Sequence, residues 1–255
     1  TKDVCVDWKA LVDVIDALGG LDLDLTKEEV HWVNGYITET ANSIGYPCDA
    51  LKGEGRVHLN GVQAVSYSRI RYTSGDDFLR ASRQRIVLQA ILEKCKGEDI
   101  ATLTSMCSSM MDDISTNFTV KEILALAKNV TKYQISSTTG FPYNVATKEL
   151  SGVGDTVIPI DLATDVVQLH KYLFEDESYT VSDTVQSISD TVQKKTDVDS
   201  KTDIYDTTKY NNTAGSTGTE GAKKKNKDAQ DALKKSQSES ENDSTTKSSS
   251  DDSDD

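Results

Sequence analysis

The sequence predicts an α/β fold, because segments with the apolar spacing of helices alternate with segments typical of strands. Apolar residues between positions 8 and 18 follow the period of an amphipathic helix, which Asp7 is placed to cap. Residues 21–25 then alternate strictly between Leu and Asp, the pattern of a strand with one buried face. A capping box at Thr26 and Glu29 opens a second helix. Helix, strand and helix in succession indicate an α/β domain.

The later elements are predicted from the same local signals. We expect, in order, a short helix at about 59–66, a strand at 67–72, a polar loop at 73–77, a long helix at 78–94, a helix at 123–128 opened by the capping box of Thr119 and Glu122, a strand at 157–160, and a final helix capped by Asp161 that runs to about 174.

Composition divides the chain into a domain and a tail. All Trp, Phe, Cys, Met and Pro residues precede position 177, and Ser, Thr, Asp, Lys and Asn dominate after it. Such a stretch buries too little apolar surface to offset the entropy lost on ordering, about 1–2 kcal/mol per residue. The sequence therefore predicts one domain over residues 1–176 and a disordered acidic tail over residues 177–255.

Charge and composition exclude some classes of function. The net charge of −14 argues against a nucleic-acid partner, because binding phosphate backbones requires a basic face. No segment reaches the ~20 apolar residues of a membrane span, and no signal peptide is visible. The four cysteines lack metal-binding spacing, so buried thiols are favoured, with Cys95–Cys107 the preferred pair if a disulfide forms. The three histidines, at positions 31, 58 and 170, are scattered, and no nucleophile constellation surrounds them.

Arginines gather between residues 67 and 85 and predict an anion site. Arg69 and Arg71 lie two apart on the expected strand, so their side chains leave by one face while Ile70 points into the core. Arg80 and Gln84 share one face of the next helix, and a short loop would fold the two pairs together. Three guanidinium groups near a helix N-terminus suit a phosphate or pyrophosphate.

A surface of salt bridges is the alternative reading of these arginines. Asp76, Asp77 and Glu93 are nearby carboxylates that could pair with them. The two same-face arginines on the strand favour a bound anion, because they need something negative opposite them. Asp22 and Asp24 could suggest a metal site, but they lie on the solvent face of their strand and are poor candidates.

The arginine block resembles the LytR-CpsA-Psr (LCP) family of cell-envelope phosphotransferases. The segment from Leu59 to Tyr72, Asp77-Phe-Leu-Arg80, and Arg83-Gln84 with Leu88 are similar to the family pattern L-x-G-x-x-A-x-x-Y-x-R-x-R, D-F-x-R-x-x-R-Q-x-x-x-L. Residues 11–23 also resemble the helix, Gly-Gly turn and strand of that family. The similarity runs from about residue 4 to 174. It implies a central mixed β-sheet flanked by helices, with the first strands of the domain missing.

The resemblance implies a function at the cell membrane. Family members transfer a glycopolymer from a polyprenyl-pyrophosphate carrier onto peptidoglycan, outside the membrane. By this resemblance Arg69, Arg71, Arg80 and Gln84 hold the pyrophosphate, and the two strand arginines are the catalytic candidates. Leu88, Ile91 and Leu92 would face the lipid, together with the helix around Leu124–Leu126. Mg²⁺ or Mn²⁺ would assist, held by ligands in a preceding part of the domain, where the family also has a membrane anchor.

Two other classes of function stay open. A non-catalytic module could hold an anionic envelope lipid or polymer in the same site, and turnover would separate it from the enzyme. A transcription regulator is a further alternative, because such proteins have been named in that way. The acidic charge and the lack of a recognition-helix pattern disfavour it.

Overall fold

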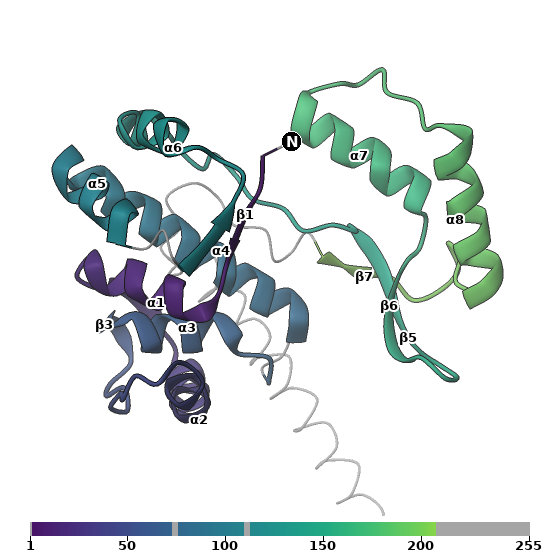
Figure 1. Cartoon of the computed structure of the whole chain (residues 1–255). Coiled ribbons are helices and arrows are strands. Elements are labelled where there is room, and N and C mark those ends of the chain that lie inside the picture. Colours follow the sequence, from purple (N-terminus) through teal and green to yellow (C-terminus); the bar gives the residue numbers. More distant parts are fainter. Residues whose placement is uncertain (1, 73–75, 110–112, 208–255) are drawn as a thin grey trace, which may run out of the picture. The chain divides into compact units, whose positions relative to one another are not determined.

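The computed structural model describes residues 2–72, 76–109 and 113–207 (Figure 1). The described chain divides into two compact units, residues 2–135 and residues 136–207. Among the described residues, no helix is long and apolar enough to cross a membrane.

The first unit is mostly helical, with two small antiparallel sheets. Strand β1 (Val4–Val6) pairs with β4 (Ile114–Thr116), and β2 (Leu21–Leu25) pairs with β3 (Gly55–Leu59). The helices are α1 (Trp8–Ala17), α2 (Lys27–Ile44), α3 (Gly61–Arg69), α4 (Asp76–Gly97), α5 (Ile100–Ser109), α6 (Val120–Ala127) and the 3₁₀ turn η2 (Val130–Lys132).

The helix starts expected from the sequence are confirmed. Asp7 accepts a hydrogen bond from the backbone N–H of Ala10 and caps α1. Both capping boxes form, Thr26 with Glu29 at α2 and Thr119 with Glu122 at α6. Each box satisfies backbone N–H groups that the first helical turn leaves without partners.

Strand β2 anchors the core as its alternation predicts. Leu21, Leu23 and Leu25 are buried, while the two Asp residues between them are partly exposed. In the antiparallel register Leu21 lies opposite Leu59 of β3. Gly20 precedes the strand at a φ of 83°, and a Cβ there would collide with the carbonyl oxygen of Leu59 and the ring of His58.

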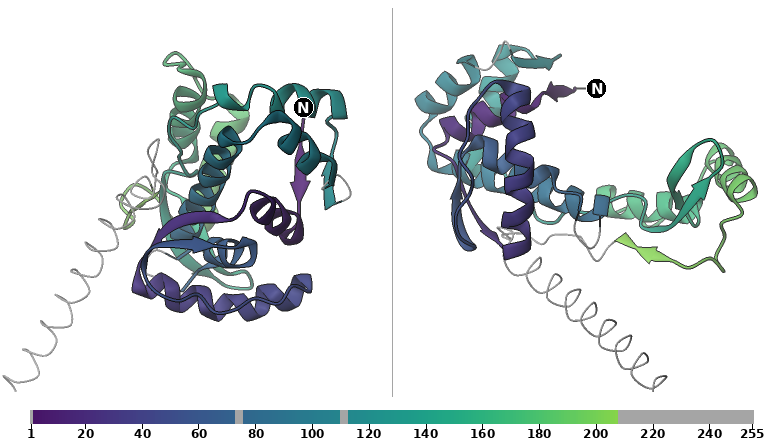
Figure 2. Two further views of the ribbon diagram at one scale, coloured as in Figure 1. Left: turned by 90° about the vertical axis from the view of Figure 1, so that its left-hand side faces the viewer. Right: turned by 90° about the horizontal axis from the view of Figure 1, so that it is seen from below.

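Helix α3 lies at the centre of the first unit, against α1, α2 and α4 (Figure 2). Nearly every side of it is buried, including the ring of Tyr67. The strand expected at 67–72 is therefore wrong: the helix continues through Arg69, and only then does the chain extend, at Ile70. The physical reason is that the Asn60–Gln63 capping box starts a helix that packs on all sides, and packing outweighs the local strand preference.

The expected central mixed sheet is absent from the described residues. Without a strand at 67–72, β2 pairs with β3 alone, and the described strands form three small antiparallel sheets. The predicted α/β class is confirmed, but the core of the first unit is a cluster of helices packed on the antiparallel pair of β2 and β3, which helix α2 separates in the sequence.

The second unit combines an antiparallel sheet with two helices. Strands β5 (Asn144–Leu150), β6 (Gly154–Pro159) and β7 (Tyr205–Asp206) are ordered β6-β5-β7. Asp161 caps α7 (Leu162–Phe174), as predicted, and α8 (Asp183–Thr196) follows. The strand expected at 157–160 is the second half of β6.

The prediction of disorder from residue 177 is wrong for α8 and β7. Ser182 caps α8, and Val192 packs with Val198 against a small core on the sheet. Gln193 Nε2 also donates to the backbone oxygen of Ile160 at 2.9 Å. The few apolar residues here suffice because they cover an existing sheet instead of building a core alone. Residues 208–255 of the predicted tail lie outside the described residues.

Candidate functional site: an arginine cavity with an aromatic side

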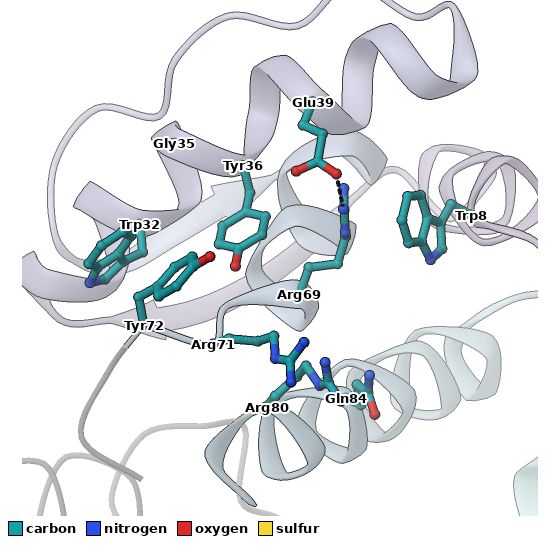
Figure 3. A pocket seen from close by; sticks show the side chains of 10 residues that line it. All are labelled: Trp8, Trp32, Gly35, Tyr36, Glu39, Arg69, Arg71, Tyr72, Arg80 and Gln84. Atoms are coloured by element: carbon teal, nitrogen blue, oxygen red, sulfur yellow. Dashed lines mark hydrogen bonds and ion pairs between the residues drawn. The ribbon is translucent and has the colours of Figure 1, made fainter. Parts of the chain in front are cut away.

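The four polar residues predicted to bind pyrophosphate line one cavity of about 490 Å³ in the first unit (Figure 3). The structure brings Arg69, Arg71, Arg80 and Gln84 together from three segments: the end of α3, the extended residues after it, and the first turns of α4. The described residues that line it are Trp8, Trp32, Gly35, Tyr36, Glu39, Arg69, Arg71, Tyr72, Arg80 and Gln84.

Arg69 is the least exposed of the three cavity arginines, and several contacts hold its side chain in place. Its side chain is only 13% exposed, and Nη2 donates to Glu39 Oε1 at 2.6 Å. Nη1 donates to Thr40 Oγ1 at 2.8 Å, and the guanidinium carbon lies 3.7 Å from the ring centroid of Trp8. These contacts fix the guanidinium plane at the cavity wall before any ligand arrives.

Arg71 and Arg80 share a single carboxylate. Asp77 Oδ2 accepts from Arg71 Nη2 at 2.7 Å, and its Oδ1 lies 2.9 Å from Arg80 Nη2. The two guanidinium groups are thereby drawn to the same point, and both stay partly exposed, 51% and 34%. Both side chains line the cavity next to Gln84, as Figure 3 shows.

The structure agrees in part with the alternative interpretation, in which these arginines form a surface of salt bridges. Asp77 pairs with two of the arginines as that reading expects, whereas Glu93 pairs with Lys96 at 2.7 Å. The side chain of Asp76 lies outside the described residues. The three arginines nevertheless line a concave space, in which Glu39 is the one carboxylate among the lining residues that the structure describes, and a flat surface of salt bridges does not produce such a space.

Arg83 is not among the residues predicted to hold the pyrophosphate, and the structure gives it a supporting position. It is fully buried, with Nε donating to Glu29 Oε1 at 3.1 Å and Nη1 donating to the backbone oxygen of Ile70 at 3.3 Å. Ile70 stands between Arg69 and Arg71 and is completely buried, as predicted. Arg83 therefore holds the backbone from which the two cavity arginines project.

Other residues of the cavity were not predicted. Trp32, Tyr36 and Glu39 come from α2, about 30 residues before the arginines in the sequence, and only the packing of α2 on α3 brings them close. No local pattern connects two such distant segments. Trp32 and Tyr36, one helical turn apart on α2 and only half-buried, were the one available signal.

The three residues expected to face a lipid do not line this cavity. Leu88 follows Gln84 on α4 and is 57% exposed, whereas Leu92 is half-buried and Ile91 packs against the core. Helix α6, which carries Leu124 and Leu126, has no buried residue. A lipid-facing role for these residues stays a prediction.

The remaining polar candidates have structural partners. Asp22 Oδ1 accepts a hydrogen bond from His58 Nδ1 at 2.9 Å, and this hydrogen bond holds the pKa of Asp22 below its usual value. Asp24 pairs with Arg56 at 3.4 Å. Within residues 2–72, 76–109 and 113–207, no three His, Cys, Asp or Glu side chains are grouped so as to hold a metal ion.

The four cysteines are free thiols, so the Cys95–Cys107 pair is not bonded. Cys48, Cys95 and Cys107 are half-buried, in partial agreement with the expectation of buried thiols, but Cys5 is exposed. Burial raises the pKa of the Cys95 and Cys107 thiols, which disfavours the reactive thiolate.

Comparison with known proteins matches this arrangement to a family. The model of the LytR_cpsA_psr family matches residues 2–167. The polyisoprenyl-teichoic acid–peptidoglycan teichoic acid transferase TagU of Bacillus mycoides is 30% identical over 128 residues, which cover 49% of this chain and 36% of that protein. TagV of Bacillus subtilis, named as the same kind of transferase, is 28% identical over 127 residues, which cover 49% of this chain and 30% of TagV.

Solved structures agree on the fold. A protein of Enterococcus faecalis described as a transcriptional regulator has a TM-score of 0.50 at 14% identity, over 77% of this chain and 66% of that one. The chain spans about a third of the length of the curated relatives that it matches. Because the family model covers well over half of the sequence, the chain belongs to the LytR_cpsA_psr family.

Proposed function

We propose that this chain carries the carrier-binding site of a phosphotransferase that moves a glycopolymer from polyprenyl pyrophosphate onto peptidoglycan. The observation that carries the proposal is the convergence of Arg69, Arg71, Arg80 and Gln84 on one cavity. Membership of the family and the names of TagU and TagV support it. The site would work at the outer face of the bacterial cell membrane.

In this proposal the arginines bind the pyrophosphate and stabilise its charge during transfer. The oxygen of an acceptor hydroxyl forms a bond to the phosphorus that bears the glycopolymer. The bond from that phosphorus to the bridging oxygen breaks, polyprenyl phosphate leaves with the electron pair, and the hydroxyl proton is released. Arg71 and Arg80 neutralise the charge that builds on the phosphate oxygens, while Arg69 and the Gln84 amide orient the group.

A need for Mg²⁺ or Mn²⁺ stays a prediction. No group of three or more metal-binding side chains occurs in the part of the chain that the structure describes, and no step is assigned to a cation. Its chemistry, if supplied, would add to the charge neutralisation that the arginines provide.

Transfer by the protein from a labelled polyprenyl-pyrophosphate glycopolymer to peptidoglycan tests the proposal. Arg71→Ala is expected to reduce the rate by roughly 100-fold or more, because it removes a donor to charge that grows in the transition state. Arg56→Ala is the matched control, since Arg56 is about as exposed, 54% against 51%, and lies outside the cavity.

Two outcomes would contradict the proposal that the protein catalyses this transfer at the arginine cavity. Carrier binding that requires Arg71 but gives no transfer by the complete protein would indicate the non-catalytic binding module. Equal activity in the Arg71→Ala and Arg56→Ala variants would show that the cavity is not the site of transfer.

A further inference from the structure

One side of the arginine cavity is a cluster of aromatic rings that the pyrophosphate does not require. Trp32 and Tyr72 lie with ring centroids 5.1 Å apart, and Tyr36 stacks on Tyr72 at 6.3 Å (Figure 3). Tyr72 directly follows Arg71 in the chain and is 67% exposed, so its ring adjoins the phosphate-binding groups and faces outward. Trp8, the fourth ring of the cavity, lies 3.7 Å from the guanidinium carbon of Arg69, which is also 5.4 Å from the ring centroid of Tyr36.

The α2 residues of the cavity lie on one face of that helix. Trp32, Gly35, Tyr36 and Glu39 follow the i, i+3, i+4, i+7 spacing of a single helix face, and all four line the cavity. Gly35 is exposed in the middle of the helix, and a Cβ there would meet nothing within 4 Å. Close packing therefore does not explain this glycine, which weakens the helix by roughly 1 kcal/mol relative to Ala. It leaves an open space between two aromatic rings.

The lining of the cavity fits a sugar better than a lipid. None of its ten residues, all described, is Leu, Ile, Val or Met, whereas an isoprenoid chain is expected on aliphatic surface. The C–H face of a pyranose ring stacks on aromatic rings, and its hydroxyls need polar partners at the edge. Tyrosine hydroxyls, the indole N–H groups and the Glu39 carboxylate supply such partners.

We propose that Trp32, Tyr36 and Tyr72 form a subsite for the sugar that is bonded directly to the pyrophosphate. This inference rests on the proposed function, because the bound pyrophosphate is what brings the sugar beside Tyr72. The rings would recognise the first residue of the glycopolymer, and the arginines would recognise the charge that every carrier shares. Selection among glycopolymers would then lie on α2 and at Tyr72.

Isothermal titration calorimetry with two soluble probes tests the subsite. One probe is farnesyl pyrophosphate, and the other is the same molecule with one N-acetylglucosamine on its terminal phosphate. For the wild-type protein we expect the sugar-bearing probe to bind about tenfold more tightly, the size of one good aromatic contact. Tyr72→Ala should bring the two dissociation constants together and leave that of farnesyl pyrophosphate unchanged.

Controls separate the subsite from the phosphate site and from folding. Tyr72 is mostly exposed, so its removal leaves the core intact, and Trp32→Ala provides a second variant with the same expected effect. Tyr133→Ala removes an exposed tyrosine outside the cavity and should change neither constant. Arg71→Ala should weaken both probes by the same factor.

The outcomes are distinguishable. Equal binding of both probes to the wild-type protein, with Arg71→Ala weakening both, would overturn the sugar subsite and keep the proposed function. Equal weakening of both probes by Tyr72→Ala would also overturn it, because the ring would then serve the lipid or the pyrophosphate. Failure of either probe to bind, or binding that does not depend on Arg71, would overturn the proposed function and the subsite together.

Discussion

Arg69, Ile70 and Arg71 show how three consecutive residues divide between core and site. Ile70 is fully buried, and its carbonyl accepts from the buried Arg83, so the flanking arginines must project to the cavity. Arg69 and Arg71 were expected to share one face because they lie two apart on a predicted strand. The structure does bring them to one cavity, although Arg69 ends helix α3 and the chain extends only from Ile70. The sequence did not predict the role of Arg83, since helical spacing alone cannot distinguish a buried arginine from a solvated one.

Removing Arg83 is expected to destabilise the fold. Arg83→Met leaves the carboxylate of Glu29 buried without its ion-pair partner, which costs about 3–5 kcal/mol in free energy of unfolding. Urea unfolding followed by circular dichroism measures this loss. Arg56→Ala, which removes an arginine that is 54% exposed, should change the free energy by less than about 1 kcal/mol.

The double variant Arg83→Met, Glu29→Gln checks the cause of that effect. Neutralising Glu29 removes the unpaired charge, so the double variant should be more stable than Arg83→Met alone. A single variant as stable as the wild type, or a double variant less stable than the single one, would contradict the buried ion pair.

At the scale of elements, the starts of helices were predicted well from local sequence signals, whereas the arrangement of strands in sheets was predicted poorly. Asp7, Thr26, Thr119 and Asp161 start the helices expected of them, because a cap depends on residues three positions apart. The prediction of a strand at 67–72 was wrong because the local sequence allows either a helix or a strand there, and the packing around the segment decides between them. Helix α8 was not predicted for a related reason: its few apolar residues stabilise it only because they pack on the sheet.

Helix α3 packs so closely on α1 that Gly61 has no room for a side chain. A Cβ at Gly61 would collide with the backbone carbonyl of Val12, and the Gly61 N–H donates to Asp16 Oδ1 at 2.6 Å. Gly61→Ala should therefore lower the free energy of unfolding by about 1–3 kcal/mol.

Gly35→Ala is the matched control for Gly61→Ala, because it changes the same residue type inside a helix where a Cβ meets nothing. It should raise the free energy of unfolding by up to about 1 kcal/mol through helix propensity. Thermal and urea unfolding of both variants measure the difference. Equal effects of the two changes would show that α1 and α3 do not pack as closely as described.

At the scale of the whole molecule, the arginine cavity belongs to the first unit alone, while the family match extends into the second. The chain carries a net charge of −14, so the three arginines form a local basic site on an acidic protein. That contrast favours a small, highly charged group at the cavity itself.

The second unit should become less stable as the pH rises through the titration of Asp165. This side chain is buried, and burial raises its pKa to about 6, although hydrogen bonds from the backbone of Tyr143 and Asn144 oppose the shift. Between the ordinary pKa of 3.8 and about 6, the folded state binds a proton that the unfolded state has lost. The contribution of this group to stability therefore falls as the pH rises through that window.

Asp165→Asn removes this titration. The melting temperature of the variant minus that of the wild type should increase from pH 4 to pH 7 and level off above it, as differential scanning calorimetry would measure. Asp161, whose pKa is lowered, titrates in both proteins and cancels in the difference. A difference independent of pH would contradict a raised pKa at Asp165.

The central claim is that the arginine cavity holds the pyrophosphate of a polyprenyl carrier. Native mass spectrometry of the protein gently extracted from its own membranes tests it most directly. We predict a polyprenyl-pyrophosphate adduct on the wild-type protein and on Arg56→Ala, and its loss from the double variant Arg69→Ala, Arg71→Ala. Absence of a lipid adduct from the wild type, or its retention by the double variant, would contradict the claim and leave these arginines as a surface of salt bridges.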